Sequence, residues 1–242
     1  MSLSGAVIAF DLDGTLVETA PDLIGALNVV LSERGLPRLP VEAARSLVGR
    51  GARALLERGF AQAGEPLDPE EVGGLTARFI EVYRGRIASE SRPFPHLIEA
   101  LDELALGGAR LVVCTNKRTD LSMALLDALE LTGRFVAVVG GDAAPAAKPD
   151  PRHFLAAVEA AGGDPARALM VGDSINDVLS AKAAGAPVVV VSFGYTDTPA
   201  HALGGDAVID DFAELAAVAR RLLSALPASA ASAIGTPSAA DA

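Results

Sequence analysis

Two aspartates stand directly after an apolar run near the start of the chain. In the stretch VIAFDLDGTLVE, residues 7–10 are apolar, and Asp11 and Asp13 follow with one leucine between them. One polar turn residue would suffice to end a strand, so the second carboxylate needs another explanation. Because successive side chains alternate along an extended chain, Asp11 and Asp13 can project alike. One carboxylate can then attack an electrophile such as phosphorus while the other transfers protons.

More chemically capable residues follow later apolar runs. The triplet TNK, residues 115–117, follows LVVC, and GDSIND, residues 172–177, follows ALMV. Lys148 stands ahead of the helical pattern that leads into ALMV. Each fragment alone can be explained as a turn, a loop start, a solvated lysine or a helix cap. Together they bring acids, a hydroxyl and a lysine to the ends of separate strands.

The elements that must position these residues form an α/β pattern. Continuous apolar runs such as LVVC, ALMV and VVVV alternate with helical segments, which is typical of a parallel sheet covered on both faces. We expect a doubly wound parallel sheet with strands at 7–10, 110–114, 135–139, 168–171, 187–191 and 207–209, and helices at 95–105, 120–129, 151–161, 175–184 and 212–223. Ligands of such sheets bind outside the carboxyl ends of the strands. The acids, hydroxyl and lysine would therefore meet there.

A block of helical patterns interrupts this alternation after the first strand. Helices are expected near 21–35, 41–47, 52–63 and 69–86, with no strand between them. We expect an α/β core of residues 1–17 and 92–226, a helical insert over 18–91, and a mobile low-complexity tail at 227–242. Within the insert, Gly49 and Gly51 allow the backbone to come close to a ligand. The guanidinium of Arg50 can donate two hydrogen bonds to a carboxylate. The alternative is that this loop is an ordinary connection between helices.

Charge and composition exclude several classes of protein. The formal net charge of −11 argues against nucleic acid and against an anionic membrane as partners. Residues 18–92 hold 10 Arg and 11 Asp+Glu, so most of the acidic excess lies in the remainder. No apolar run approaches the roughly 20 residues that a membrane helix needs. We expect a cytoplasmic monomer or homodimer in which the single cysteine, Cys114, is a buried structural thiol.

The four fragments, in their order along the chain, resemble the motifs of the haloacid dehalogenase superfamily of phosphohydrolases. They are DLDGT, the threonine after the second strand, the lysine before a later helix, and GDxxxD, and the resemblance covers residues 6–225. It implies a magnesium-dependent phosphatase that passes through an aspartyl-phosphate on Asp11. Its implied Mg²⁺ ligands are a side-chain oxygen of Asp11, the backbone carbonyl of Asp13 and the carboxylate of Asp173, with Asp177 as a supporting acid.

The same resemblance implies roles for the remaining motif residues. Asp13 would act as general acid and then general base, while Thr115 and the amide of Asn116 would hold the phosphoryl oxygens. Lys148 would supply positive charge to the phosphoryl group and to Asp11. Helical inserts at this point act as caps in the superfamily, closing over the site to exclude water and to select the leaving group.

Subgroups of the superfamily can be compared by single residues. Asp13 argues against the dehalogenases, which lack the second aspartate of the first motif. The phosphonate hydrolases use a cap lysine, and residues 18–92 contain no lysine. The phrases VETAPDL, VGRGA, TNK and SFGYTD are similar to the bacterial phosphoglycolate phosphatases, although Glu18 stands where that group more often has aspartate. This likeness implies hydrolysis of 2-phosphoglycolate to glycolate and phosphate.

On this interpretation Arg50 and Gly51 contact the substrate, with Arg50 as a partner for its carboxylate. Several alternatives remain open at the level of sequence. A phosphatase for sugar phosphates or pyrophosphate, or a relative of β-phosphoglucomutase, would share the core and differ in its cap contacts. A non-catalytic phosphate-binding regulatory module would share the fold without the reaction.

Overall fold

Six parallel strands form the central sheet of the computed structural model, which describes residues 2–226. Their order across the sheet is β5 (Ala137–Gly140), β4 (Arg110–Thr115), β1 (Val7–Phe10), β6 (Ala168–Gly172), β7 (Val188–Val191) and β8 (Ala207–Ile209). The predicted doubly wound α/β sheet is confirmed. The chain builds outward from β1 in both directions, so the carboxyl ends of β4, β1 and β6 lie side by side where the strand order reverses.

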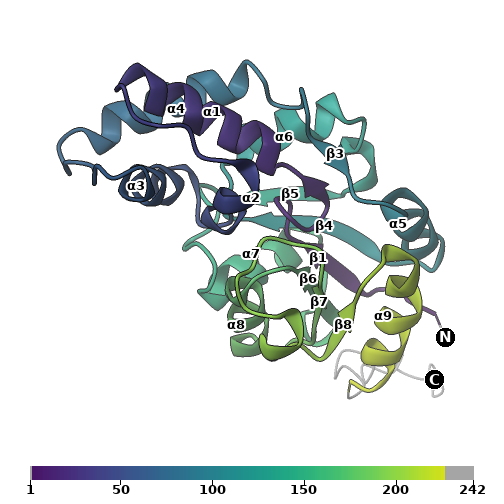
Figure 1. Cartoon of the computed structure of the whole chain (residues 1–242). Helices are drawn as coiled ribbons and strands as arrows, with labels where there is room; N and C mark the ends of the chain where they lie inside the picture. Colours follow the sequence, from purple (N-terminus) through teal and green to yellow (C-terminus); the bar gives the residue numbers. More distant parts are fainter. Residues whose placement is uncertain (1, 227–242) are drawn as a thin grey trace, which may run out of the picture.

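Helices cover both faces of the sheet (Figure 1), because consecutive strand residues are apolar and point to opposite faces. One core cluster includes Ile8 and Phe10 of β1 together with α5 (Leu97–Leu106), α6 (Thr119–Ala128) and α9 (Leu215–Ser224). The other includes Val7 and Ala9 together with α7 (Pro151–Ala160) and α8 (Ile175–Ala183). The sheet is therefore rigidly held on both sides, and its strand ends are fixed points for a site.

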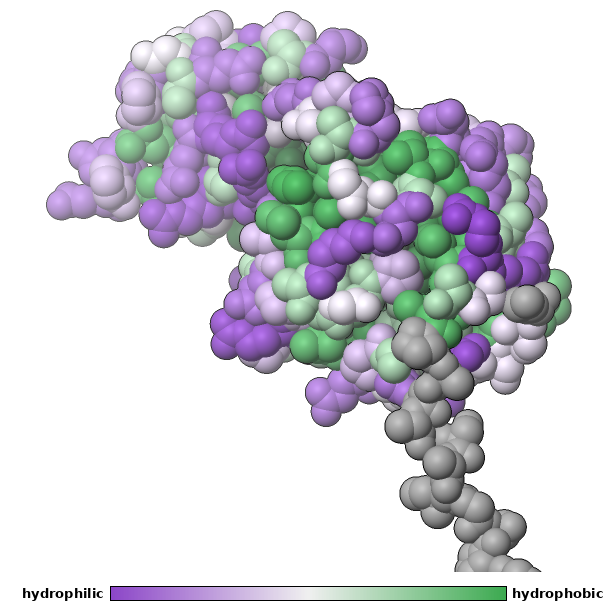
Figure 2. Space-filling view, turned by 90° about the horizontal axis from the view of Figure 1, so that it is seen from below, coloured by the Kyte–Doolittle hydropathy of each residue, from purple (hydrophilic) through white to green (hydrophobic). Residues whose placement is uncertain are grey.

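The helical insert has an apolar core of its own. Its helices are α1 (Ala20–Glu33), α2 (Val41–Ala44), α3 (Ala52–Gln62) and α4 (Val72–Arg84). Leu56, Phe60 and Phe79 are among the buried residues of its cluster, which two residues of the α/β core also join, Leu121 and Tyr195. Figure 1 shows this block at the upper left, beyond the sheet, and Figure 2 shows it from below as a lobe with a mainly hydrophilic visible face.

The chain enters and leaves the helical block through a pair of two-residue strands. β2 (Val17–Glu18) pairs antiparallel with β3 (Arg92–Pro93). The sequence did not predict this ribbon, because two residues carry no periodicity and the paired residues stand 76 and 74 positions apart. Its position coincides with the boundaries expected for an inserted cap, and this supports our proposal that residues 18–91 form a unit distinct from the core.

Most predicted elements are confirmed to within a few residues, and the differences have local causes. The helix predicted from residue 69 begins at Val72, because Asp68 accepts hydrogen bonds from the amides of Glu70 and Glu71 in a turn. The helix predicted over 41–47 is divided into α2 and a 3₁₀ turn. The short 3₁₀ segments are Arg45–Leu47, Thr132–Arg134, Pro165–Arg167, Ala200–Ala202 and Phe212–Glu214.

Three further expectations concern the chain as a whole. Cys114 is a buried free thiol on β4, as expected, and burial raises its pKa to about 12. Among residues 2–226, no helix combines the length and apolar character needed to span a membrane. The tail predicted at 227–242 lies outside the described residues.

Candidate active site

The first motif occupies the carboxyl end of β1. The amide of Asp11 donates to the carbonyl of Val171 at 2.9 Å, so the ladder between β1 and β6 continues one residue past the strand. Leu12 packs into the core on one side of the sheet. Asp11 and Asp13 are both buried, and the charge of Asp13 adds to the effects that raise the pKa of Asp11. The two carboxylates are therefore neighbours on a fixed strand end.

Lys148 links the first motif to the last. Its ammonium nitrogen lies 3.0 Å from Oδ1 of Asp11 and 2.6 Å from Oδ1 of Asp177, and it donates to the carbonyl of Cys114 at 2.7 Å. Burial alone would lower the pKa of this lysine, but the charges of Asp11 and Asp177 raise it above its ordinary value. Lys148 is thus held in its charged form between β1, β4 and the start of α8.

Asp173 follows β6 directly, and its carboxylate lies close to those of Asp11 and Asp177. Its Oδ2 accepts the amide of Tyr195 at 2.7 Å, and its Oδ1 lies 3.4 Å from the hydroxyl of Thr15. Two glycines leave room for it: a Cβ at Gly14 would come within 2.6 Å of Oδ2, and one at Gly194 within 2.1 Å of the Asp173 Cβ. Gly14 also has φ +81°, which L side chains rarely adopt.

The donor set fits a hard divalent cation. Carboxylate oxygens of Asp11, Asp173 and Asp177 lie within 4.8 Å of one another, and all three residues are buried. Oδ1 of Asp11 is buried and has no hydrogen bond of acceptable geometry, although Lys148 lies near it. Burial raises the pKa of Asp11 to about 6, and burial together with the charges of Asp177 and Asp11 raises that of Asp173. A cation would relieve this crowding of negative charge.

Asp177 differs from the other two acids because its two oxygens together accept three hydrogen bonds, whereas those of Asp173 accept two, one of them at 3.4 Å. Oδ1 accepts from Lys148, and Oδ2 accepts from the amide and the hydroxyl of Ser174 at 3.0 and 2.7 Å. The bond from the Ser174 amide to Asp177 is one half of the capping box of α8. Asp11 and Asp173 therefore retain more free lone pairs for a ligand than Asp177 does.

The second motif holds the loop that carries Lys148. Thr115 is buried at the end of β4, and its hydroxyl accepts the amide of Lys117 at 3.2 Å. The side chain of Asn116 accepts the amide of Lys148 at 2.9 Å and donates to its carbonyl at 3.1 Å. The side chain of Asn116 is thus occupied in positioning Lys148.

His153 is a positioning residue to which the sequence analysis assigned no role. His153 is fully buried; its Nδ1 accepts the amide of Lys148 at 3.2 Å and its Nε2 lies 3.1 Å from the carbonyl of Val139. These partners fix the neutral tautomer with hydrogen on Nε2. Burial, with the nearby charge of Lys148, lowers its pKa to about 4. The sequence feature that could have suggested this role is its position five residues after Lys148.

Lys117 is a second residue to which the sequence analysis assigned no role. Its ammonium lies 2.9 Å and 3.1 Å from the two carboxylate oxygens of Asp13. The same nitrogen lies 4.5 Å from the centre of the Tyr83 ring, which comes from α4 of the helical block. Although burial would lower the pKa of Lys117, the charge of Asp13 raises it. The signal was the position of Lys117 two residues after Thr115, on the same strand-end segment.

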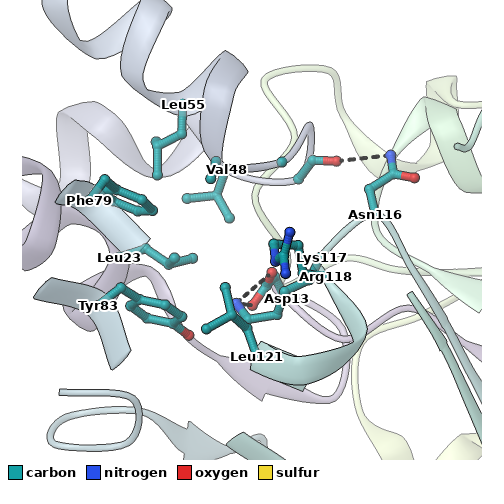
Figure 3. A pocket seen from close by; sticks show the side chains of 13 residues that line it. Asp13, Leu23, Val48, Leu55, Phe79, Tyr83, Asn116, Lys117, Arg118 and Leu121 are labelled. Atoms are coloured by element: carbon teal, nitrogen blue, oxygen red, sulfur yellow. Dashed lines mark hydrogen bonds and ion pairs between the residues drawn. The ribbon is translucent and has the colours of Figure 1, made fainter. Parts of the chain in front are cut away.

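A cavity of about 60 Å³ opens beside this ion pair (Figure 3), between the helical block and the core. Its polar wall consists of Asp13, Asn116, Lys117 and Arg118. The rest of its wall is mainly apolar and comes from α1, α3, α4, α6 and the loop after Leu47: Leu23, Val48, Gly49, Gly51, Ala52, Leu55, Phe79, Tyr83 and Leu121. The helical block thus forms a roof over Asp13.

The loop singled out in the insert lies against the core. Asn116 Nδ2 lies 3.5 Å from the carbonyl of Gly49, and Gly51 lines the cavity beside Asp13. Arg50 is exposed and lines two other cavities, of about 560 and 130 Å³. The larger also contains Lys148 and the smaller contains Asp173. Arg50 therefore faces the site from outside the cavity that borders Asp13.

A family model and several relatives of known description match this chain. The family model described as haloacid dehalogenase-like hydrolase matches residues 6–185. The chain is 60% identical to the phosphoglycolate phosphatase of Caulobacter vibrioides over 93% of its own length and 95% of the relative's. It is 48% identical to the phosphoglycolate phosphatase of Agrobacterium fabrum, over 85% of this chain and 88% of that one.

A solved structure shows the same architecture. The crystal structure of a predicted phosphoglycolate phosphatase from Haemophilus somnus 129pt superimposes with a TM-score of 0.83 at 33% identity. The superposition covers 90% of this chain and 99% of that one. Both the core and the helical block therefore have counterparts in a protein of known structure.

Proposed function

This chain belongs to the haloacid dehalogenase-like hydrolase family, and from that premise we propose that it is a phosphatase that hydrolyses 2-phosphoglycolate to glycolate and phosphate. The observation that carries the chemistry is the convergence of Asp11, Asp13, Asp173 and Lys148 at three adjacent strand ends. The relatives' shared description as phosphoglycolate phosphatases supports the choice of substrate.

The proposed reaction has two steps at phosphorus. In the first step Asp13 is protonated. A carboxylate oxygen of Asp11 attacks the phosphoryl group, the bond from phosphorus to the ester oxygen breaks, and Asp13 gives its proton to that oxygen. Water then attacks the phosphoryl group on Asp11, Asp13 takes a proton from it, and phosphate leaves. Lys148 positions Asp11 and offsets the charge that develops on the phosphoryl oxygens, which Thr115 and the amide of Asn116 hold.

We propose Mg²⁺ as the cation, held by Asp11, the backbone carbonyl of Asp13 and Asp173, with Asp177 orienting Lys148 and α8. Oxygen donors of carboxylates and carbonyls are the ligands that Mg²⁺ prefers. When bound, it would offset the negative charge of the phosphoryl group and of the facing carboxylates. The buried acids with raised pKa values support a cation at this position.

The cavity under the helical block is small, and this favours a small leaving group. The cavity beside Asp13, the proposed proton donor, holds about 60 Å³, whereas one water needs about 10–15 Å³ on such a scale. This is room for roughly five small groups, which suits a two-carbon acid better than a hexose. Arg50 and Gly51 are proposed to contact the substrate from the cap side, Arg50 from the two cavities that flank this one.

A substrate panel tests the proposal. Initial rates of phosphate release are measured with Mg²⁺ for 2-phosphoglycolate, hexose phosphates, pyrophosphate and an aryl phosphate, and again after a chelator is added. We expect the highest kcat/KM for 2-phosphoglycolate and loss of all turnover without the cation. A higher kcat/KM for a hexose phosphate or for pyrophosphate would contradict the proposed substrate. Absence of turnover on every ester would favour a phosphate-binding regulatory module.

A further inference from the structure

The buried ion pair of Lys117 and Asp13 forms one wall of the cavity into which the leaving group would project. Lys117 has a side chain only 5% exposed and lies on the polar side of the cavity. An ammonium has three hydrogens, and the carboxylate of Asp13 takes at most two of them. Figure 3 shows Lys117 and Asp13 near the middle of the view, with Leu23, Phe79 and Tyr83 to one side of them.

A leaving group that carries its own negative charge needs a cation in this mainly apolar space, because an unpaired charge there is costly. Arg118 also lines the cavity, but its side chain is half exposed and paired with Asp120 at 3.0 Å. Arg50 does not line it. Within the described residues, Lys117 is thus the cation that is both buried and in contact with this cavity.

The helical block fixes the position of this cation. The ring of Tyr83 lies 4.5 Å from the ammonium, and an ammonium over an aromatic face is attracted to it. Tyr83 is itself fully buried and stacks with Phe79, 6.1 Å away between ring centres. The charge is therefore held between a core carboxylate and an aromatic ring of the helical block, at the wall of the cavity.

We infer that Lys117 is the specificity-determining residue for an anionic leaving group, and that it, in place of Arg50, pairs with the substrate carboxylate. The inference rests on the proposed function and deepens it by naming the residue that recognises the glycolate part. A carboxylate there would share the ammonium with Asp13, at the side of the phosphoryl group from which the ester oxygen departs.

Two substrates of similar size test whether Lys117 recognises the carboxylate or only supports the reaction on any ester. 2-Phosphoglycolate and 2-hydroxyethyl phosphate are similar in size, and only the first has a carboxylate. In Lys117→Gln the amide can still donate to Asp13 but carries no charge. We expect the ratio of kcat/KM for the two substrates to fall by about 10- to 100-fold, as for loss of a charged hydrogen bond. Lys117→Arg keeps the charge and should keep most of the preference, even at a lower rate.

Two control variants complete the test. Lys182→Met removes an exposed ammonium paired with Asp206 and should leave the ratio unchanged. Arg50→Ala should lower the ratio much less than Lys117→Gln does. The inference is overturned if Lys117→Gln reduces both rates by the same factor, if Lys117→Arg loses as much preference as Lys117→Gln, or if Arg50→Ala alone abolishes the preference.

Pyrophosphate serves as a third substrate and separates this inference from the proposed function. If the wild-type protein prefers pyrophosphate and Lys117→Gln removes that preference, recognition of an anionic leaving group by Lys117 stands while 2-phosphoglycolate is wrong. If the wild-type protein prefers 2-phosphoglycolate and Lys117→Gln keeps that preference, the proposed function stands and the role of Lys117 is wrong.

Discussion

At the scale of single residues, the site is defined by which polar atoms have partners and which do not. Asp177 has hydrogen bonds at both carboxylate oxygens, whereas Oδ1 of Asp11 has none of acceptable geometry. Lys148 and Lys117 each serve one of the two first-motif acids. The two acids therefore have different surroundings, as their different proposed roles require: Asp11 lies in the acidic cluster, and Asp13 borders the cavity under the helical block.

His153 gives a pH prediction at this scale. Its pKa is about 4 in the folded protein against an ordinary value near 6.5, so the unfolded chain binds a proton first as the pH falls. Above pH 6.5 His153 is neutral in both states and does not make stability depend on pH. Between pH 6.5 and 4 it lowers the free energy of unfolding by up to about 1.4 kcal/mol for each unit by which the pH falls. Asp11 and Asp173, whose pKa values are raised, act in the opposite direction.

The measurement is urea unfolding of the wild-type protein and of His153→Gln at pH 7.0, 6.0 and 5.0, with a chelator present. The acids contribute to both proteins and cancel in the difference. The stability gap between the two proteins should shrink as the pH falls. A gap that stays constant or widens toward pH 5 would show that His153 is not buried in its neutral form.

At the scale of elements, the two connections between core and helical block are tied together by one acid. Asp22 in the first turn of α1 is fully buried, and its Oδ2 accepts the amides of Glu90 and Ser91 and the hydroxyl of Ser91. Its Oδ1 lies 3.3 Å from Nε of Arg86. The start of the insert is thus bound to its end, next to the β2–β3 ribbon.

Asp22→Ala should therefore destabilise the protein more than loss of an ordinary surface acid. Each buried amide left without an acceptor costs about 1–3 kcal/mol, so we expect a loss of about 2 kcal/mol or more in urea unfolding. Glu33→Ala is the control. Glu33 is an exposed acid at the other end of α1, paired with Arg78 of α4, and its loss should cost much less than the loss of Asp22. Equal losses would contradict the role given to Asp22.

Tyr195 shows why such ties escape sequence analysis. Its hydroxyl accepts the amides of Thr19 and Ala20 and donates to Glu18, while its own amide donates to Asp173. The phrase SFGYTD was noticed in the sequence only as a likeness to relatives. The partners of its hydroxyl lie 175 to 177 positions earlier, and no local pattern indicates a pair at that separation.

The parts that the sequence did predict have local causes. The sheet, its helices and the strand-end positions of Asp11, Asp173 and Thr115 follow from apolar runs and from the polar residue that ends each run. Lys117 and His153 could not be assigned in this way, because their roles depend on Asp13 and on the Lys148 loop, which reach them only through the tertiary fold.

At the scale of the whole molecule, a cation that binds the strand-end acids should stabilise the folded chain. A ligand present at 100 times its Kd adds about 2.7 kcal/mol, which raises Tm by on the order of 5–10 °C for a protein of this size. We expect such a rise with Mg²⁺ in differential scanning fluorimetry of the wild-type protein at pH 7.5.

Asp173→Asn should lose most of that rise, because it removes one proposed ligand. Glu103→Gln, a change at an exposed acid paired with Arg220, should keep it. If Asp173→Asn responds to Mg²⁺ as the wild-type protein does, the cation does not bind at the strand ends.

The central claim is that Asp11 attacks phosphorus, and the kcat of Asp11→Asn for 2-phosphoglycolate with saturating Mg²⁺ tests it most directly. With circular dichroism and Tm showing a folded variant, we predict a kcat at least about 10⁴-fold below that of the wild-type protein, as for loss of a nucleophile. A kcat within tenfold of the wild-type value would contradict the account.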